Sequence, residues 1–161
     1  MSGGQCRRPP VVVVTGPTAS GKSERAVVLA ERFGGEIVNA DSLQIYRYLD
    51  IGSAKPSTEA RARVPHYLYD VVTPDVAYNA ARYQVEARAT LARVHARGAP
   101  AFLTGGTGLY IRACLEGILP GVEPDPELRQ RLEEEHRRAL VDGDPERLHR
   151  RLAEQIGRAH V

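Results

Sequence analysis

A glycine-rich segment that ends in lysine and serine carries the clearest chemistry of this chain. Its spacing is the G-x-x-x-x-G-K-S of a phosphate-binding P-loop. Glycine lets the backbone turn tightly, so that successive N–H groups point into one concavity that can hold a phosphate. The residues expected to bind a di- or triphosphate are Gly16, Pro17, Thr18, Ala19, Ser20, Gly21, Lys22 and Ser23. Lys22 would add a mobile positive charge, and the Ser23 hydroxyl is a suitable Mg²⁺ ligand.

The elements on either side of this segment have the order that a P-loop requires. Residues 11–15 are a short β-branched run that predicts a strand, and residues 22–33 have the apolar spacing of a helix that Gly34 ends. The positive end of that helix dipole would point at the bound phosphates. Strand, loop and helix together therefore predict an anion site at the carboxyl end of the first strand.

Asp41 is the second candidate for chemistry. It follows a short predicted strand at 36–39, and the carboxyl ends of such strands carry the ligand sites of open α/β sheets. Three interpretations remain open from its position alone. Asp41 holds Mg²⁺ or its water in a kinase or ATPase, serves as a general base in a group transfer, or caps a short helix that begins at Ser42.

The third predicted strand, residues 101–104, lacks the terminal acid of a Walker B site. It runs instead into Gly105-Gly106-Thr107-Gly108, which weakens an ATPase interpretation and favours a second backbone cradle for substrate. The alternative is a tight strand-to-helix turn whose glycines are needed for positive φ.

The remaining core elements predict an α/β fold. A short strand is expected within 67–72, and helices are expected at 79–97 and from 109 to 115. Strands that alternate with helices predict a parallel sheet covered on both faces, with the turns gathered at one edge.

The composition changes after residue 119. Two charged helices are expected at about 126–140 and 145–154, in which arginines alternate with acids. They form either a solvated face or a helical insertion that touches a large polyanion. The last residues, 156–161, are expected to be a non-native tail, because they match the translation of a common sequencing adaptor.

Composition limits the class of protein. The 161 residues carry a net charge of +2, which requires no particular partner. Cys6 and Cys114 are far apart, which suits a reducing cytoplasm. Residues 1–10 are expected to be a disordered tail, and the apolar run after them is too short for a membrane span. The only lysines, in a chain that otherwise uses arginine, are Lys22 and Lys55.

Several segments in order resemble the amino-terminal half of a tRNA dimethylallyltransferase, also called tRNA isopentenyltransferase. They are Gly16–Ser23, Asn39–Tyr46, Asp50–Pro56, Val64–Asp70 and Gly105–Tyr110. The resemblance implies a P-loop NTPase-like core at 11–119 and the start of a helical, tRNA-binding insertion at 120–155.

The resemblance also implies a reaction. A dimethylallyl group passes from dimethylallyl diphosphate to N6 of adenosine-37, in the anticodon loop of tRNA. The P-loop would hold the diphosphate with Mg²⁺ through Ser23, and Lys22 and Asp41 would be catalytic, Asp41 as general base. The residues implied to contact tRNA are Asp41, Ser42, Leu43, Gln44, Thr107 and Arg129. Lys55 lies in a family motif without an assigned role.

Members of that family are about twice as long, so the resemblance implies that this chain alone binds poorly and turns over slowly. We expect a cytoplasmic monomer that makes no membrane contact. Two other classes remain open from the residues: a P-loop nucleotide or small-molecule kinase, and a non-catalytic P-loop binding module in which Asp41 is only a cap.

Overall fold

The computed structural model describes residues 9–118 and 125–159. The chain divides into two compact units, Met1–Pro120 and Gly121–Val161. The tail predicted at 1–10, the boundary predicted at 119–120 and the segment predicted as non-native at 156–161 each fall at least partly outside the described residues.

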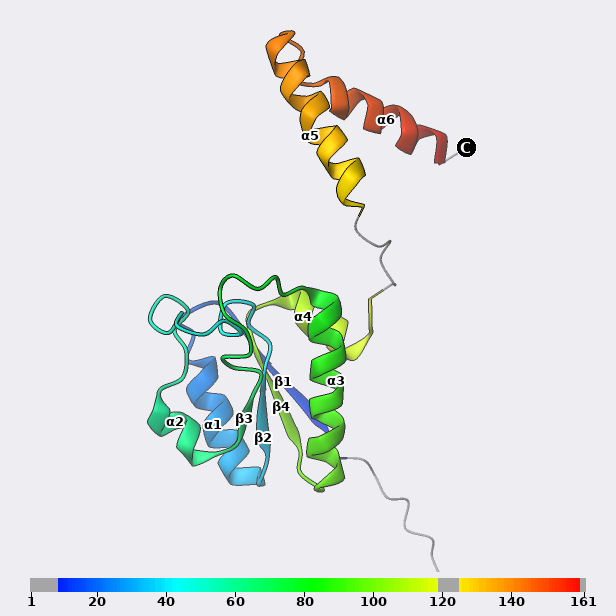
Figure 1. Ribbon diagram of the computed structural model, residues 1–161. Helices are drawn as coiled ribbons and strands as arrows, with labels where there is room; N and C mark the ends of the chain where they lie inside the picture. The colour runs from blue at the N-terminus through cyan, green and yellow to red at the C-terminus, as the bar shows by residue number, and fades with distance from the viewer. Residues whose placement is uncertain (1–8, 119–124, 160–161) are drawn as a thin grey trace, which may run out of the picture. The chain divides into compact units, whose positions relative to one another are not determined.

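Parallel strands form the centre of the first unit, as predicted (Figure 1). Within the described residues they make one sheet in the order β1-β4-β2-β3. The strands are β1 (Val11–Thr15), β2 (Glu36–Asn39), β3 (His66–Tyr67) and β4 (Ala101–Gly105). Every residue of β2 and β4 is buried, whereas Val12 and Val13 of the edge strand β1 are partly exposed. The central strands thus have the continuous burial typical of a sheet covered on both faces.

Helices cover the two faces of this sheet. They are α1 (Lys22–Phe33), α2 (Thr58–Arg63), α3 (Ala80–Ala96) and α4 (Gly108–Leu115). The predicted helices at 22–33, 79–97 and 109–115 are confirmed, and Asn79 caps α3 by accepting a hydrogen bond from the Arg82 N–H at 2.9 Å. The short helix α2, which begins after Ser57, was not predicted.

The core lies in two layers, because successive side chains of a strand point to opposite faces. Val38 and Leu103 pack with α3 and α4, while Ile37 and Phe102 pack with α1. On the first side Tyr83 is fully buried, and its hydroxyl donates a hydrogen bond to the Asn39 carbonyl oxygen at 2.8 Å. Helix α3 is thereby fixed to the end of β2, directly before Asp41.

The prediction of a strand within residues 67–72 is largely wrong. Only His66 and Tyr67 pair with β2, and the chain then turns, because Leu68 and Asp70 have left-handed backbones with φ of 62° and 55°. Val72 returns to form an isolated parallel bridge with Tyr46.

The glycines after β4 have two predicted roles, a backbone cradle for substrate and a tight turn that needs positive φ. Gly105, Gly106 and Gly108 do not adopt positive φ, so the second of these reasons is wrong, and the cradle stays a prediction. A Cβ on Gly105 would lie 2.2 Å from both the carbonyl carbon and the oxygen of Ala40. Glycine is needed at position 105 because two backbones approach closely there, beside Asp41.

The substitution Gly105→Ala is expected to lower the free energy of unfolding by about 2–3 kcal/mol, since the backbone of Ala40 has to move. Urea unfolding of this chain measures the change. The matched control is Gly108→Ala at the start of α4, where nothing lies within 4 Å of the added Cβ. That control is expected to change stability by no more than about 1 kcal/mol. Equal losses in the two variants would contradict the steric explanation.

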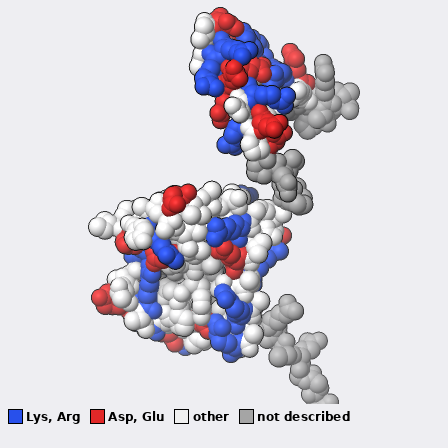
Figure 2. All heavy atoms as spheres, in the orientation of Figure 1, with Lys and Arg blue, Asp and Glu red and all other residues white. Residues whose placement is uncertain are grey.

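The second unit consists of two helices in its described residues, α5 (Pro126–Val141) and α6 (Arg147–Ala159), which confirms the two predicted helices. The Asp125 carboxylate caps α5 by accepting from the Leu128 N–H at 2.9 Å. Figure 2 shows positive and negative side chains intermixed over this unit, and Arg138, Arg147, Arg150 and Arg151 form ion pairs within it. In the described parts of the chain, no helix is both long and apolar enough to cross a membrane.

Candidate active site

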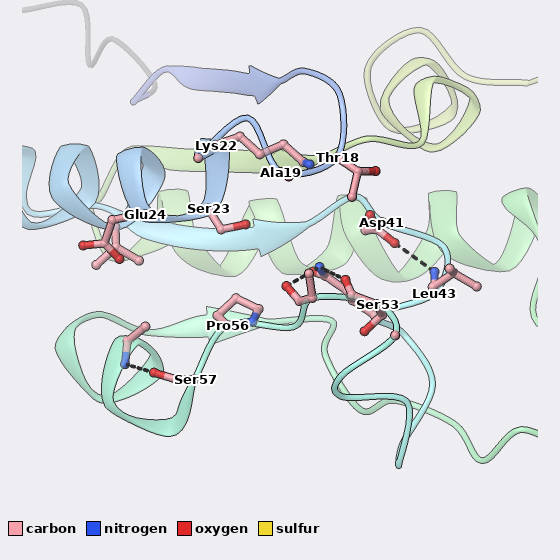
Figure 3. Close-up of a pocket in the computed structure, with 16 residues that line it drawn as sticks. Thr18, Ala19, Lys22, Ser23, Glu24, Asp41, Leu43, Ser53, Pro56 and Ser57 are labelled. Carbon is pink, nitrogen blue, oxygen red and sulfur yellow. Dashed lines mark hydrogen bonds between the residues drawn. The ribbon is translucent and has the colours of Figure 1, made fainter.

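A cavity of about 380 Å³ lies between the loops that follow β1 and β2 and the segment 52–57 (Figure 3). Figure 3 shows Lys22, Ser23 and Asp41 on one side of the cavity and Ser53, Pro56 and Ser57 across from them. The residues that line it are Thr18, Ala19, Gly21, Lys22, Ser23, Glu24, Val27, Asp41, Leu43, Gln44, Gly52, Ser53, Ala54, Pro56, Ser57 and Ala60. The two chemical motifs predicted from separate strands therefore meet at one cavity.

The P-loop has the backbone of an anion site. Ala19 and Gly21 have positive φ values of 63° and 77°, and the Ser20 N–H donates to the Pro17 carbonyl oxygen at 3.3 Å. Alternating right- and left-handed residues direct successive N–H groups into one concavity. Gly21 precedes α1 and offers no side-chain cap, so no side chain occupies the donors of the first turn. These donors and the helix dipole favour an anion.

Only part of the predicted P-loop faces the cavity. Thr18, Ala19, Gly21, Lys22 and Ser23 line it, whereas Gly16, Pro17 and Ser20 do not. The Lys22 ammonium lies over the loop and donates to the Pro17 carbonyl oxygen at 3.3 Å. Its long side chain keeps the charge next to the first turn of α1.

The Asp41 carboxylate is held by one oxygen. Its Oδ1 accepts a hydrogen bond from the Leu43 N–H at 3.0 Å, which makes a local turn rather than the cap of a helix. Within residues 9–118 and 125–159, Oδ2 receives no hydrogen bond. The backbone of Asp41 is fixed by buried Asn39, whose Oδ1 accepts from the Asp41 N–H at 3.0 Å. A carboxylate anchored at one oxygen, with the other available, is suited to accept a proton.

The other acidic side chain of the cavity is already paired. Glu24 lies 2.7 Å from the Arg63 guanidinium, an ion pair between α1 and α2. Tyr69 does not line the cavity but interacts electrostatically with Asp41; its pKa is far above its usual range, chiefly because of burial and despite the opposing effect of Arg61, so its phenol stays neutral. Among the described acids that line the cavity, Asp41 is the better placed base.

The predicted tRNA-contacting residues fall into three groups. Asp41, Leu43 and Gln44 line the cavity. Ser42 and Thr107 do not line it and are hydrogen-bonded to one another: the Thr107 Oγ1 accepts from the Ser42 N–H at 2.9 Å, and the two hydroxyls are 3.2 Å apart. Arg129 is on α5, in the second unit.

The far wall of the cavity was not predicted as part of the site. Gly52, Ser53, Ala54, Pro56 and Ser57 line it, and all come from the segment around Lys55. The signal available in the sequence was that Lys55 is one of only two lysines in the chain.

Comparison with known proteins identifies the family. The family model for IPP transferases matches residues 44–159. The chain is 52% identical over 155 residues to the tRNA dimethylallyltransferase of Myxococcus xanthus, covering 96% of this chain and 49% of that protein. It is 54% identical over 143 residues to the enzyme of the same name from Anaeromyxobacter dehalogenans, covering 89% of this chain and 46% of that protein.

Comparison with solved structures identifies the same family. A full-length tRNA isopentenylpyrophosphate transferase from Bacillus halodurans superposes with a TM-score of 0.68 at 36% identity, over 93% of this chain and 48% of that one. A eukaryotic dimethylallyltransferase acting on tRNA superposes with a TM-score of 0.67 at 27% identity, over 74% of this chain and 31% of that one. The chain spans about half the length of the curated relatives it matches. Its sequence and its fold show that it belongs to the IPP transferase family.

Proposed function

We propose that this chain forms the donor-binding and base-bearing half of an enzyme that transfers a dimethylallyl group from dimethylallyl diphosphate to N6 of adenosine-37 in the anticodon loop of tRNA. The observation that carries the proposal is the meeting of Asp41 and the P-loop at one cavity. The family supports this reaction over the kinase alternative and over a non-catalytic binding module.

The P-loop would bind the diphosphate of the donor. Diphosphate leaves readily only if the charge that develops on its oxygen is neutralised. The first-turn N–H groups of α1 and the Lys22 ammonium supply positive charge at that place. The same groups stabilise an ATP phosphate in other P-loop proteins, and here they would stabilise a departing diphosphate.

The cavity also fits Mg²⁺ as the cofactor. Mg²⁺ is usually held by one or two protein oxygens together with substrate phosphates and water, rather than by a cage of side chains. Ser23, at the first turn of α1, offers a hydroxyl beside the proposed phosphate position, and Asp41 lines the same cavity. We assign Ser23 as the protein ligand. The ion would neutralise charge on the diphosphate when bound.

Asp41 would take the proton from the adenine amino group. The N6 nitrogen forms a bond to the allylic carbon, the carbon–oxygen bond to diphosphate breaks, and the N6 proton goes to Oδ2 of Asp41. An amino group conjugated with adenine is a weak nucleophile, so a positioned base accelerates this step. The base has to leave the stack to reach the cavity, and an unpaired loop nucleotide does so at low cost.

The tRNA contacts are part of the proposal. Leu43 is 53% exposed beside Asp41 and presents an apolar surface to an unstacked base. Ser42 and Thr107 shape the turn that carries Leu43 and Asp41, through their mutual hydrogen bonds. Arg129, in the charged helical unit, would contact tRNA phosphate.

The proposed domain organisation follows the same logic. Residues 11–119 are the P-loop core, residues 120–155 begin a helical insertion that touches tRNA, and residues 156–161 are a non-native tail. The partly exposed Val12 and Val13 at the edge of the sheet suit a core completed by the remaining half of a longer enzyme. We propose that the enzyme acts in the cytoplasm, as a monomer.

Thermal shift tests the donor assignment. The protein for this test is a hybrid enzyme in which this chain replaces the matching half of the Myxococcus xanthus relative. Dimethylallyl diphosphate with Mg²⁺ is expected to raise its Tm, because a ligand at about 100 times its Kd adds about 2.7 kcal/mol of stability. ATP with Mg²⁺ at the same concentration is the control, and a larger shift with ATP would contradict the proposal.

A further inference from the structure

Lys55 has a function that the P-loop chemistry does not explain. Its side chain is only 2% exposed. Its ammonium donates three hydrogen bonds: to the Tyr46 carbonyl oxygen at 2.9 Å, to Asp50 Oδ1 at 2.7 Å and to Asp70 Oδ1 at 2.7 Å. A lysine ammonium has three N–H donors. All three are used within the protein, so Lys55 is not a second phosphate-binding lysine.

Asp70 is the centre of this network. Its other carboxylate oxygen, Oδ2, accepts from Arg61 of α2 at 2.7 Å. Its carbonyl oxygen accepts from Arg47 at 2.9 Å, and its N–H donates to the Gln44 carbonyl oxygen at 3.3 Å. Burial raises the pKa of Asp70, but the hydrogen bonds from Lys55 and Arg61 bring it below its usual value, so the carboxylate remains charged.

The backbone of Asp70 is in an unfavourable conformation that these contacts maintain. Its φ is 55°, which costs a non-glycine residue free energy unless neighbours determine the geometry. Hydrogen bonds to the amide, the carbonyl oxygen and both carboxylate oxygens of Asp70 determine its geometry here. The network therefore ties the turn at Gln44, the segment at Lys55 and helix α2 to one residue.

The segment held in this way is the far wall of the cavity. The Lys55 N–H donates to the Asp50 carbonyl oxygen at 3.1 Å, which closes the loop between these residues. From the cavity side, the buried Gln44 amide donates to the carbonyl oxygens of Ser53 and Ala54, at 2.9 and 3.2 Å. Figure 3 shows Ser53 and Pro56 across the cavity from the P-loop. Gln44 lines this cavity, whereas Lys55 does not and instead lines a second cavity together with Arg61 and Asp70.

We propose that Lys55 and Asp70 are positioning residues, which hold residues 50–57 as the wall that closes the donor cavity against the P-loop and Asp41. The cavity part of this inference rests on the proposed function. Neither residue touches the reacting atoms. Their loss would let the wall move away, so that the donor binds in more than one position relative to Asp41. Misplacement of a bound reactant by about 1 Å lowers the rate by up to about a hundredfold.

The test is Lys55→Met in the hybrid enzyme, with two measurements. Hydrogen exchange at the backbone amides of residues 54 and 55 is expected to become about tenfold faster. The exchange rates in α3 are expected to stay unchanged, because the substitution allows only this segment to open locally. The ratio kcat/KM for dimethylallyl diphosphate is expected to fall about tenfold to a hundredfold. The KM for tRNA is expected to stay within about twofold, since the tRNA contacts assigned above are not in this segment.

The matched control is Arg97→Met. Arg97 forms a bidentate ion pair with Glu36 at the amino end of β2, away from the cavity. Its loss removes a more exposed ion pair of the same unit, with the Arg97 side chain 48% exposed, and is expected to leave both the Ala54 exchange and kcat/KM unchanged. If Arg97→Met lowers kcat/KM as much as Lys55→Met does, the effect is one of general stability and the proposal is wrong.

A second variant covers the case in which Lys55→Met does not fold. Asp50→Ala removes the Asp50 carboxylate, whose side chain is 67% exposed, together with its hydrogen bond from Lys55, and leaves Lys55 paired with Asp70. It is expected to produce the same pattern at a smaller size. Unchanged Ala54 exchange in Asp50→Ala, or faster exchange with unchanged kcat/KM, would overturn the proposal.

Failure of the proposed function gives a different result. If the unsubstituted hybrid uses no allylic diphosphate, the reaction assigned above is wrong, and the exchange measurement still decides whether Lys55 holds the wall.

Discussion

Replacement of Asp41 by asparagine is expected to abolish prenyl transfer while leaving dimethylallyl diphosphate bound with nearly unchanged affinity. The amide keeps an oxygen that can accept from the Leu43 N–H, so the turn is preserved. Its nitrogen then replaces Oδ2 and cannot take a proton. Loss of a general base lowers kcat by about 10²–10⁴-fold.

Single-turnover kinetics of the hybrid enzyme with saturating donor separate this loss from donor binding. The matched control is Glu24→Gln, the other cavity carboxylate, which is paired with Arg63. It is expected to change the transfer rate by only a few fold. A transfer rate in Asp41→Asn equal to that of the unsubstituted hybrid would remove Asp41 from the mechanism and leave it as a residue that shapes the turn.

The substitution Lys22→Met is expected to have the other large effect, on both donor binding and transfer. Lys22 is the cation that lines the cavity beside the first turn of α1, and methionine keeps its length without its charge. Removal of a preorganised group that stabilises developing charge costs about 10²–10³-fold in kcat. We expect a loss of that size in kcat/KM for dimethylallyl diphosphate, with the tRNA affinity retained.

The control for this substitution is Arg25→Met, also on α1 but not lining the cavity. It removes the same charge from the same helix, so a general electrostatic effect on the donor would appear in both variants. Isothermal titration with dimethylallyl diphosphate and Mg²⁺ measures the affinities. Equal donor affinity in Lys22→Met and the unsubstituted hybrid would show that the lysine does not bind the diphosphate.

The parallel sheet and its main helices are predictable because their signals are local. β1 and β4 are short, mainly apolar runs, β2 has an apolar Ile-Val centre after a glycine pair, and α1 and α3 have long helical periodicity. The strand predicted at 67–72 is mostly wrong because Leu68 and Asp70 take left-handed backbones, which depend on distant partners. Helix α2 has six residues and none is buried, so no apolar periodicity marks it.

The P-loop and Asp41 are predictable for the same reason. The wall of the cavity formed by the segment around Lys55 is not. The P-loop spacing and the position of Asp41 after β2 bring both to one sheet edge. The wall depends on Lys55 meeting Asp70, fifteen residues away in sequence, and on Gln44 bonding across to Ser53. No local pattern encodes those contacts. The steric need for glycine at position 105 is likewise not a local signal, because the approaching backbone is that of Ala40, which follows β2.

The most direct test of the central claim is the fate of the donor in the presence of tRNA. The hybrid enzyme is incubated with unmodified tRNA, Mg²⁺, isotope-labelled dimethylallyl diphosphate and ATP, and the digested nucleosides are analysed by mass spectrometry. We expect one labelled five-carbon group on N6 of adenosine-37, one diphosphate released for each group transferred, and no consumption of ATP. Consumption of ATP with no labelled adenosine would contradict the account.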